Sequence, residues 1–338
     1  MQRLKFFGNR QAAVEQAPTP APPDDGVLIE VKATALCGTD LHSLYRKPEE
    51  SPCTPGHEFA GTVAETGKNS RFRKEDRITI YCAPGCGQCW FCKVGAAIAC
   101  PVDRTYIGFQ RDGGDAEFAA VPDRACLVLP DDISFEDGAL IGDGVASIYH
   151  GLKKAGGVRE GDTVGVFGVG PMGLGMTNLA SFFGATVIAI DSNQYRLDLA
   201  QKLGAKHTIN LTQVDVNKTI HELTDGKGLS LAIECAANPA ATTAALENVG
   251  YWGKVLLIGE HDNAHVKPSS QVLSKELTIT GTRYFHHSDY DDAIALMRKG
   301  FRPERMVTHR FNLSDGPEAF RLFDQGKTGK VVLAPHPE

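Results

Sequence analysis

Short apolar runs separated by turn-forming residues fill the first part of the chain, to about residue 140. Runs at residues 27–31, 59–63 and 76–81 are bounded by proline, glycine or aspartate. Apolar runs of this length between such residues predict β-strands. We therefore expect a β-rich lobe in this part of the chain.

From residue 163 the pattern changes to strands that alternate with helical stretches. Strands are predicted at residues 163–167, 186–190, 207–210, 229–234, 254–258 and 277–280, and helices at 171–183, 193–203 and 240–248. This alternation predicts an α/β fold with a doubly wound parallel sheet covered by helices on both faces. Two further helices, at 289–298 and 317–325, and a strand at 330–333 are expected to return to the first lobe.

The 338 residues are enough for two domains. We expect the β-rich domain to be discontinuous and to comprise residues 1–144 and 284–338. The parallel-sheet domain is expected at residues 145–283.

Charge and composition exclude several classes of protein. The 35 Lys and Arg residues against 41 Asp and Glu give a net charge of -6, so neither nucleic acid nor an anionic membrane is an expected partner. No stretch approaches the roughly 20 apolar residues of a membrane helix, and the N-terminal residues lack the apolar core of a signal peptide. We expect a cytoplasmic protein, in which the nine cysteines are metal ligands or catalytic thiols rather than disulfides.

Four of these cysteines are closely spaced. Cys86, Cys89, Cys92 and Cys100 follow the pattern C-x2-C-x2-C-x7-C. Four thiolates can surround one tetrahedral Zn²⁺ and leave no position open for substrate, so the cluster predicts a structural zinc site. An iron–sulfur cluster uses the same ligands. A zinc ribbon that binds nucleic acid also has similar cysteine pairs, but only Lys93 and Arg104 supply positive charge nearby.

A second candidate metal site lies upstream. Cys37 opens the stretch Cys-Gly-Thr-Asp-Leu-His, and His57 lies in Gly-His-Glu twenty residues later. A thiolate and an imidazole need a third ligand to hold Zn²⁺ with a fourth position open. On spacing alone, a single Cys or His is more often a packed or solvated residue.

A glycine-rich turn follows the strand at 163–167 and opens the next helix. It consists of Gly168, Val169, Gly170, Pro171, Met172 and Gly173. Such a G-x-G-x-x-G turn lets backbone approach a pyrophosphate at the helix N-terminus. Asp191 ends the next strand, where its carboxylate would accept hydrogen bonds from ribose hydroxyls and repel a 2′-phosphate, so NAD is favoured over NADP.

Taken together, these motifs resemble the zinc-containing medium-chain dehydrogenase/reductase family of alcohol, polyol and threonine dehydrogenases. The resemblance covers nearly the whole chain, and its further stretches are Gly56-His57-Glu58-Phe59-Ala60-Gly61, Asp112-Gly113-Gly114, Ala116-Glu117-Phe118 and Gly329-Lys330-Val331-Val332. It implies a GroES-like catalytic domain, a Rossmann domain that binds NAD, and two zinc ions per subunit. It also implies a homodimer or homotetramer that pairs through the edge of the dinucleotide domain.

The resemblance also assigns roles to single residues. Asp143 takes the position of the third catalytic-zinc ligand, where Cys or Glu is commoner, and Glu58 lies behind the ligands or acts as an exchangeable fourth ligand. Thr39 would hydrogen-bond the substrate hydroxyl, and His42 would carry the proton to the surface, although it also fits an ordinary surface histidine. Asp40 is a candidate to orient an imidazole, or a turn residue. The expected cofactor contacts beyond the turn are Arg196, Ile258, Gly259, Thr282 and Arg283, of which Arg196 also fits an exposed helix charge.

The reaction implied is the interconversion of a secondary alcohol and its ketone by hydride transfer to NAD. A polyol, sugar or sugar-derived alcohol is the first choice, because Cys82 replaces the aromatic residue typical of simple-alcohol enzymes. A threonine-type or simple-alcohol dehydrogenase is the alternative within the family, and a catalytically silent cofactor-binding relative is the alternative of another class. Residues 283–287 are polar enough to contact a sugar or phosphate, or form an exposed loop.

Overall fold

The computed structural model describes residues 1–336, so the last two residues of the predicted segment 284–338 lie outside the described residues. The chain forms two compact units. The β-rich unit comprises Met1–Asp143, Phe285–Ile294 and the described residues from Val307 onward, and the parallel-sheet unit comprises Gly144–Tyr284 and Ala295–Met306.

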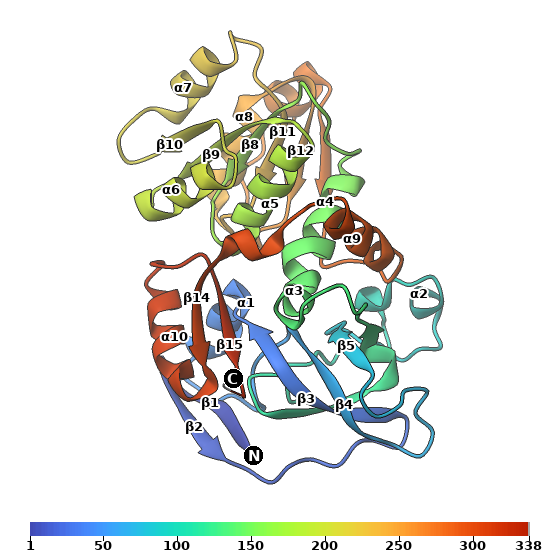
Figure 1. Cartoon of the computed structure of the whole chain (residues 1–338). Helices are drawn as coiled ribbons and strands as arrows, with labels where there is room; N and C mark the ends of the chain where they lie inside the picture. The colour runs from blue at the N-terminus through green and yellow to red at the C-terminus, as the bar shows by residue number, and fades with distance from the viewer. Residues whose placement is uncertain (337–338) are drawn as a thin grey trace. The chain divides into compact units, whose positions relative to one another are not determined.

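The β-rich unit is built from a seven-stranded sheet and a separate hairpin (Figure 1). Its strands are β1 (Gln2–Gly8), β2 (Gln11–Gln16), β3 (Gly26–Ala35), β4 (Phe59–Thr66), β5 (Arg77–Ile80), β6 (Phe118–Pro122), β7 (Cys126–Val128), β14 (Val307–Asn312) and β15 (Lys330–Ala334). Its helices are α1 (Gly38–Asp40), α2 (Trp90–Lys93), α3 (Phe135–Leu140) and α10 (Gly316–Asp324). Strand β3 is central, because it pairs antiparallel with β4, β6 and β15.

The core of this unit lies between the hairpin, helix α10 and strand β15. Phe6 of β1 meets the ring of Phe320 edge-on, with ring centroids 4.8 Å apart, and Tyr45 packs against both rings. Such edge-on aromatic pairs are favourable beyond the area that they bury. This packing fixes the π-helical turn η1 (Leu41–Tyr45), which directly follows α1.

The parallel-sheet unit holds six parallel strands in the order β10-β9-β8-β11-β12-β13. The strands are β8 (Thr163–Phe167), β9 (Thr186–Asp191), β10 (His207–Asn210), β11 (Leu229–Glu234), β12 (Val249–Leu257) and β13 (Thr278–Gly281). The helices are α4 (Ile148–Lys154), α5 (Pro171–Phe182), α6 (Gln194–Lys202), α7 (Val216–Leu223) and α8 (Pro239–Asn248). The limit between the units passes through helix α9 (Ser288–Arg298) and the π-helical turn η4 (Ile141–Ser147).

Helices cover both faces of the six-stranded sheet, as the alternation in the sequence predicts. Helices α5 and α6 pack on β8, β9 and β10, and α8 packs on β11, β12 and β8 with α7 beside it (Figure 1). The four central residues of β9, 187–190, are apolar and buried, as expected of a strand in a sheet that is covered on both faces. The predicted doubly wound α/β fold is therefore confirmed. Within residues 1–336, no helix is long and apolar enough to cross a membrane.

Candidate metal centres and dinucleotide site

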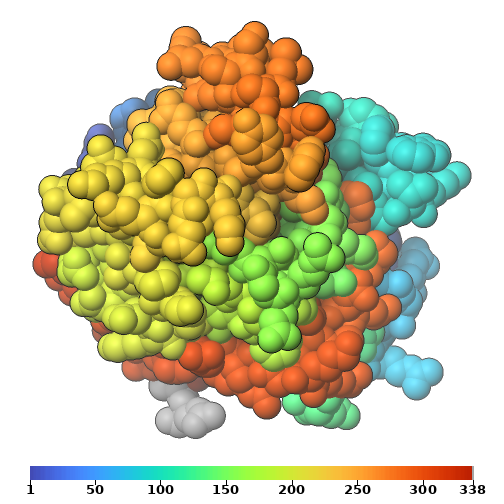
Figure 2. Space-filling view, turned by 90° about the horizontal axis from the view of Figure 1, so that it is seen from above, coloured from blue at the N-terminus to red at the C-terminus, as the bar shows by residue number. Residues whose placement is uncertain are grey.

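The four clustered cysteines converge in the loop between β5 and β6, which projects in cyan in Figure 2. The Sγ atom of Cys89 lies 3.5 Å from that of Cys92 and 3.7 Å from that of Cys100, and those of Cys86 and Cys92 are 4.0 Å apart. These separations are close to the roughly 3.8 Å between sulfur atoms that a tetrahedral zinc with 2.3 Å bonds requires. The donor set therefore fits a closed Zn²⁺ site.

Backbone N–H groups stabilise thiolates in this loop. Cys89 N–H donates to Cys86 Sγ at 3.4 Å, and Asp103 N–H donates to Cys100 Sγ at 3.3 Å. Burial raises the pKa of the Cys100 thiol, but the N–H groups around it outweigh burial and lower that pKa to about 6. A thiol that ionises easily is a better metal ligand.

Three ligand types meet at the second site. Strands β3 and β4 are paired where Ala35 N–H donates to Glu58 O, so Cys37, just after β3, and His57, just before β4, lie side by side. Asp143 of η4 completes the set: its Oδ2 is 3.2 Å from Cys37 Sγ and 3.5 Å from His57 Nε2. One sulfur, one nitrogen and one carboxylate oxygen fit a Zn²⁺ ion, and a carboxylate oxygen of Glu58 lies within 4.8 Å of all three, near the position that a fourth ligand or a substrate would take.

Burial and charge shift the pKa values of these three groups. Burial, followed by the charge of Asp143, raises the pKa of Cys37 to about 11. Burial also acts to raise the pKa of Asp143, but its hydrogen bond and charge interaction with His57 lower that pKa overall. The pKa of His57 is raised despite burial, chiefly by the carboxylate of Asp40.

Asp40 orients both Cys37 and His57. Its Oδ1 lies 2.9 Å from His57 Nδ1, and its Oδ2 accepts a hydrogen bond of 2.9 Å from Cys37 N–H. A carboxylate on Nδ1 fixes the imidazole so that Nε2 is directed to Cys37 and Asp143. Of the two interpretations of Asp40, the geometry therefore favours the orienting role.

Glu58 is held behind the ligands by a buried cation. Its Oε1 forms an ion pair with Lys330 Nζ and lies 4.0 Å from His57 Nε2. Lys330 Nζ also donates to Leu36 O at 3.1 Å. Burial opposes the charge of Lys330, but Glu58, Cys37 and Asp143 raise its pKa. Sequence reasoning assigned Lys330 no role, although a lysine that opens the apolar strand β15 was a usable signal.

Thr39 and His42 lie on either side of Asp40 in sequence. Thr39 Oγ1 is 3.6 Å from Cys37 Sγ, whereas His42 is exposed on η1. His42 Nδ1 is 3.3 Å from the Arg46 guanidinium, and Arg46 donates to Asp324 at 2.5 Å. Burial of part of the ring, followed by the charge of Arg46, lowers the pKa of His42.

An aromatic ring flanks the metal ligands on another side. Phe109 is half-buried and its ring centroid lies 4.9 Å from that of His57. Phe109 could not be singled out from the sequence, because no motif around it indicates that this loop packs against His57.

The glycine-rich turn has the close packing that a phosphate-binding turn needs. Gly168 has φ +87°, and an added methyl group there would lie 2.7 Å from Ala236. A methyl group on Gly173 would lie 2.0 Å from Gly168 O, whereas one on Gly170 would meet only Arg196 Nη1 at 3.9 Å. The turn is therefore tight at its first and last glycines and open at Gly170, where the N-terminus of α5 begins.

Asp191 fixes this turn from the end of β9. Its Oδ2 accepts from Val169 N–H at 2.8 Å, and its Oδ1 accepts from Asn193 N–H at 2.9 Å. Each carboxylate oxygen keeps a further lone pair for a ribose hydroxyl. The remaining predicted contacts follow the carboxyl ends of two strands: Ile258 and Gly259 after β12, and Thr282 and Arg283 after β13.

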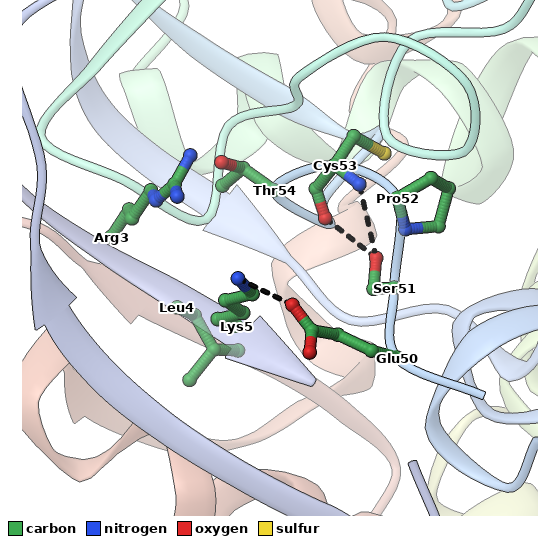
Figure 3. A pocket seen from close by; sticks show the side chains of 8 residues that line it. All are labelled: Arg3, Leu4, Lys5, Glu50, Ser51, Pro52, Cys53 and Thr54. Carbon is green, nitrogen blue, oxygen red and sulfur yellow. Dashed lines mark hydrogen bonds and ion pairs between the residues drawn. The ribbon is translucent and has the colours of Figure 1, made fainter. Parts of the chain in front are cut away.

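A separate pocket of about 300 Å³ lies beside β1 (Figure 3). Its two cations are already neutralised, since Lys5 pairs with Glu50 and Arg3 pairs with Glu15. None of the predicted site residues lines it. It is therefore not a candidate for the active site.

The fold and these sites define a class of metal-binding, dinucleotide-dependent dehydrogenases. Residues 23–131 match the alcohol dehydrogenase GroES-like domain, and residues 171–299 match the zinc-binding dehydrogenase domain. The chain belongs to the zinc-containing medium-chain dehydrogenase/reductase family.

Relatives match over almost the full length. The chain is 34% identical to the uncharacterized zinc-type alcohol dehydrogenase-like protein YphC of Escherichia coli, with 96% of each chain covered. It is 32% identical to D-arabitol-phosphate dehydrogenase of Enterococcus avium, with 98% of this chain and 96% of the relative covered.

Two solved structures show which cofactors similar proteins bind. A short chain alcohol dehydrogenase from Escherichia coli CFT073, in complex with NADH, superposes with a TM-score of 0.87 at 26% identity. A zinc-binding dehydrogenase from Sinorhizobium meliloti 1021, bound to NADP, superposes with a TM-score of 0.84 at 26% identity. In both cases, 99% of each chain is covered.

Proposed function

We propose that the protein interconverts a secondary alcohol and its ketone, with Zn²⁺ at Cys37, His57 and Asp143 and NAD as the hydride acceptor. The proposal is carried by one observation: Cys37 Sγ and His57 Nε2 lie 3.2 Å and 3.5 Å from Asp143 Oδ2, so a thiol, an imidazole and a carboxylate meet at one point. A three-ligand set with an open position is the arrangement of catalytic rather than structural zinc sites.

Bound zinc would lower the pKa of a substrate hydroxyl, and NAD would accept the hydride. Thr39 would hydrogen-bond that hydroxyl; its Oγ1 lies 3.6 Å from Cys37 Sγ, and a threonine hydroxyl can both donate and accept. Phe109 covers one side of His57 and keeps water from it. His42 is exposed, and burial of part of its ring followed by the charge of Arg46 lowers its pKa, which favours the neutral imidazole that can take up the proton.

The negative charge of Asp191 supports NAD as the preferred cofactor. A 2′-phosphate beside this carboxylate would be repelled, while ribose hydroxyls would be bound. Arg196 of α6 lies near Gly170 of the glycine-rich turn. We propose that its guanidinium lies close to the adenine of the bound cofactor. Met172, Ile258, Gly259, Thr282 and Arg283 are proposed to line the rest of the cofactor.

The proposed substrate is a polyol, a sugar or a sugar-derived alcohol. Support comes from Cys82, a small buried side chain where simple-alcohol enzymes have an aromatic ring, and from the similarity to D-arabitol-phosphate dehydrogenase. Threonine or a simple alcohol is the alternative within the family.

We also propose a homodimer or homotetramer formed through β13. This strand is one edge of the parallel sheet, and an unpaired edge is a template for pairing with another copy. Exposed apolar side chains surround it: Trp252 is 75% exposed, Leu273 70% and Ile279 41%. The orange segment that carries Leu273 and Ile279 projects in Figure 2. Patches of this kind mark interaction surfaces.

The predicted domain limits, residues 1–144 with 284–338 and residues 145–283, also remain a proposal. The cytoplasm also remains the proposed compartment, and the nine free cysteines support it.

A substrate and cofactor panel tests this function. Purified protein loaded with zinc is assayed for reduction of NAD and of NADP with polyols, sugars, sugar phosphates, threonine and simple alcohols. We expect NAD-linked turnover that is fastest with a polyhydroxylated alcohol. Turnover of threonine alone would correct the substrate class, and an absence of turnover with every pair would favour a catalytically silent relative.

A further inference from the structure

Glu234 occupies the position in the parallel sheet where a ligand is expected. It is the last residue of β11 and lies opposite Phe167 of β8 and Leu257 of β12. The strand order reverses between β8 and β11, and open α/β sheets bind ligands beyond the carboxyl ends of the strands at such a point. Glu234 therefore lies at the end of a strand beside the reversal of strand order, where a ligand of such a sheet would bind.

Glu234 accepts hydrogen bonds from the turns that follow β11 and β12. The main-chain oxygen of Glu234 accepts from Ile258 N–H and Gly259 N–H, both at 3.0 Å, after β12. Its side-chain Oε1 accepts from Ala236 N–H at 2.8 Å, after its own strand. The side chain thereby holds a turn in which Ala237 adopts φ +53°, a conformation that residues other than glycine seldom take.

The second carboxylate oxygen of Glu234 has no hydrogen-bond partner. The side chain is 0% exposed, and Oε2 would lie 2.5 Å from a methyl group on Gly259. The nearest cation-forming group is His261, whose Nε2 is 4.0 Å away and 2.9 Å from Thr242 Oγ1. Burial raises the pKa of Glu234, and the N–H groups of the turn act to lower it.

A buried carboxylate oxygen that accepts no hydrogen bond and has only a histidine 4.0 Å away costs folding free energy. Holding a turn through Oε1 does not require this cost, so its position at the carboxyl ends of the strands suggests a second role. The two turns that Glu234 joins include Gly259, one of the residues proposed to line the cofactor.

The two halves of the sheet divide the cofactor between them. Strands β8 to β10 carry the glycine-rich turn and Asp191, which suit the adenosine half. Strands β11 to β13 form the other half of the sheet, beyond the point where the strand order reverses. Their carboxyl ends are therefore expected to face the nicotinamide half. We propose that Glu234 is a positioning residue that sets the turns after β11 and β12 against the nicotinamide half of the cofactor. This inference rests on the proposed nicotinamide cofactor.

The hydrogen bonds that hold the glycine-rich turn do not involve Glu234, although Ala236 of its turn packs against Gly168. Gly168 N–H donates to Ile190 O at 2.8 Å, and Val169 N–H donates to Asp191 at the same distance. A change at Glu234 is therefore expected to affect the dinucleotide and to spare a ligand that fills only the adenosine half.

The test compares NADH with AMP as ligands of the zinc-loaded protein. Binding of both is titrated for wild type, Glu234→Gln, Glu234→Ala and the control Glu222→Gln, an exposed glutamate on α7 of the same unit. Glu234→Gln should weaken NADH binding about tenfold, the scale of one charge-assisted hydrogen bond, and leave AMP binding within about twofold. Glu222→Gln should change neither.

Glu234→Gln keeps the size of the side chain, so it remains informative if Glu234→Ala does not fold. Unchanged NADH binding in Glu234→Gln would overturn the inference, and so would equal losses for NADH and AMP, since these would show a general effect on the fold. If wild type binds neither NADH nor NADPH, the proposed cofactor is wrong and the inference fails with it.

Discussion

Single residues behind the metal ligands determine how those ligands are presented. Cys37 and His57 could be singled out only through the resemblance to the family, because a single Cys or His is more often a packed residue, and the structure brings both to Asp143. The sequence left two roles open for Asp40, because an aspartate that orients an imidazole and one that forms a turn cannot be told apart from their positions next to Cys37. Lys330 was missed, since it is about 270 residues from its partner Glu58 in the sequence.

We predict that Arg46→Gln raises the pKa of His42. Arg46 carries a positive charge beside the ring and lowers that pKa, whereas Asp324 acts in the opposite direction. The imidazole of His42 is mostly neutral, and so able to accept a proton, at pH values above its pKa. Arg46→Gln should raise that pKa and move the acid limb of kcat/KM to higher pH. Asp324→Asn should lower the pKa and move the limb to lower pH. An NMR titration of the His42 ring measures the shift directly. Lys47→Gln, next to Arg46 and exposed, is the control, and equal shifts in both variants would contradict the prediction.

Lys330→Met should destabilise the protein by about 3–5 kcal/mol, because it leaves the buried carboxylate of Glu58 without its cation. Urea unfolding at neutral pH measures the loss. The double variant Lys330→Met with Glu58→Gln should recover part of it, since no buried charge then lacks a partner. The exposed Lys327→Met is the control, and a loss no larger than in this control would show that the pair is dispensable.

At the scale of elements, strand and helix alternation was the most dependable signal. The strand at 207–210 has the predicted limits, and α5, α6 and α8 lie within one or two residues of theirs. Helix α7 was missed because it has only eight residues and three apolar positions, Val216, Ile220 and Leu223, although these have helical spacing. Strand β12 begins at Val249, whereas the prediction began at 254, because Gly250 and Gly253 are turn-forming residues that conceal its first part in the sequence.

The glycines of the dinucleotide turn are expected to separate stability from binding. A methyl group in Gly173→Ala would meet the Gly168 carbonyl, so this variant should unfold at a lower temperature and lose NADH binding. In Gly170→Ala the methyl group has room, so the unfolding temperature should be close to wild type, while NADH binding falls because the methyl group blocks the pyrophosphate. Thermal unfolding and NADH titration measure both. Equal thermal stability of the two variants would refute this account of the turn.

At the scale of the whole molecule, the family could be identified from the sequence, because its motifs are spread from Cys37 to Val332. The choice of Asp143 as the proposed third ligand rested on the resemblance, since an aspartate at position 143 departs from the commoner types, and only the folded chain brings it to Cys37 and His57. Assembly was expected from the resemblance alone. The exposed apolar residues around β13 were not distinguishable in sequence from core residues.

We predict that Ile279→Lys weakens assembly. A lysine at the edge of the sheet places a charge in the proposed interface and is a common means of blocking edge pairing. Sedimentation velocity should give a dimer or tetramer for wild type and a larger share of monomer for Ile279→Lys. Leu211→Lys changes a comparably exposed residue after β10, at the opposite edge of the sheet, and should leave the assembly intact. A monomeric wild type would contradict the proposed interface.

The central claim, an open zinc site completed by Asp143, is tested most directly by the zinc content per subunit of wild type and Asp143→Ala, measured together with NAD-linked activity. Asp131→Ala, which removes an exposed carboxylate of the same unit, is the control. We predict two zinc ions in wild type and in the control, and one in Asp143→Ala with loss of turnover. Two zinc ions and unchanged turnover in Asp143→Ala would contradict the account.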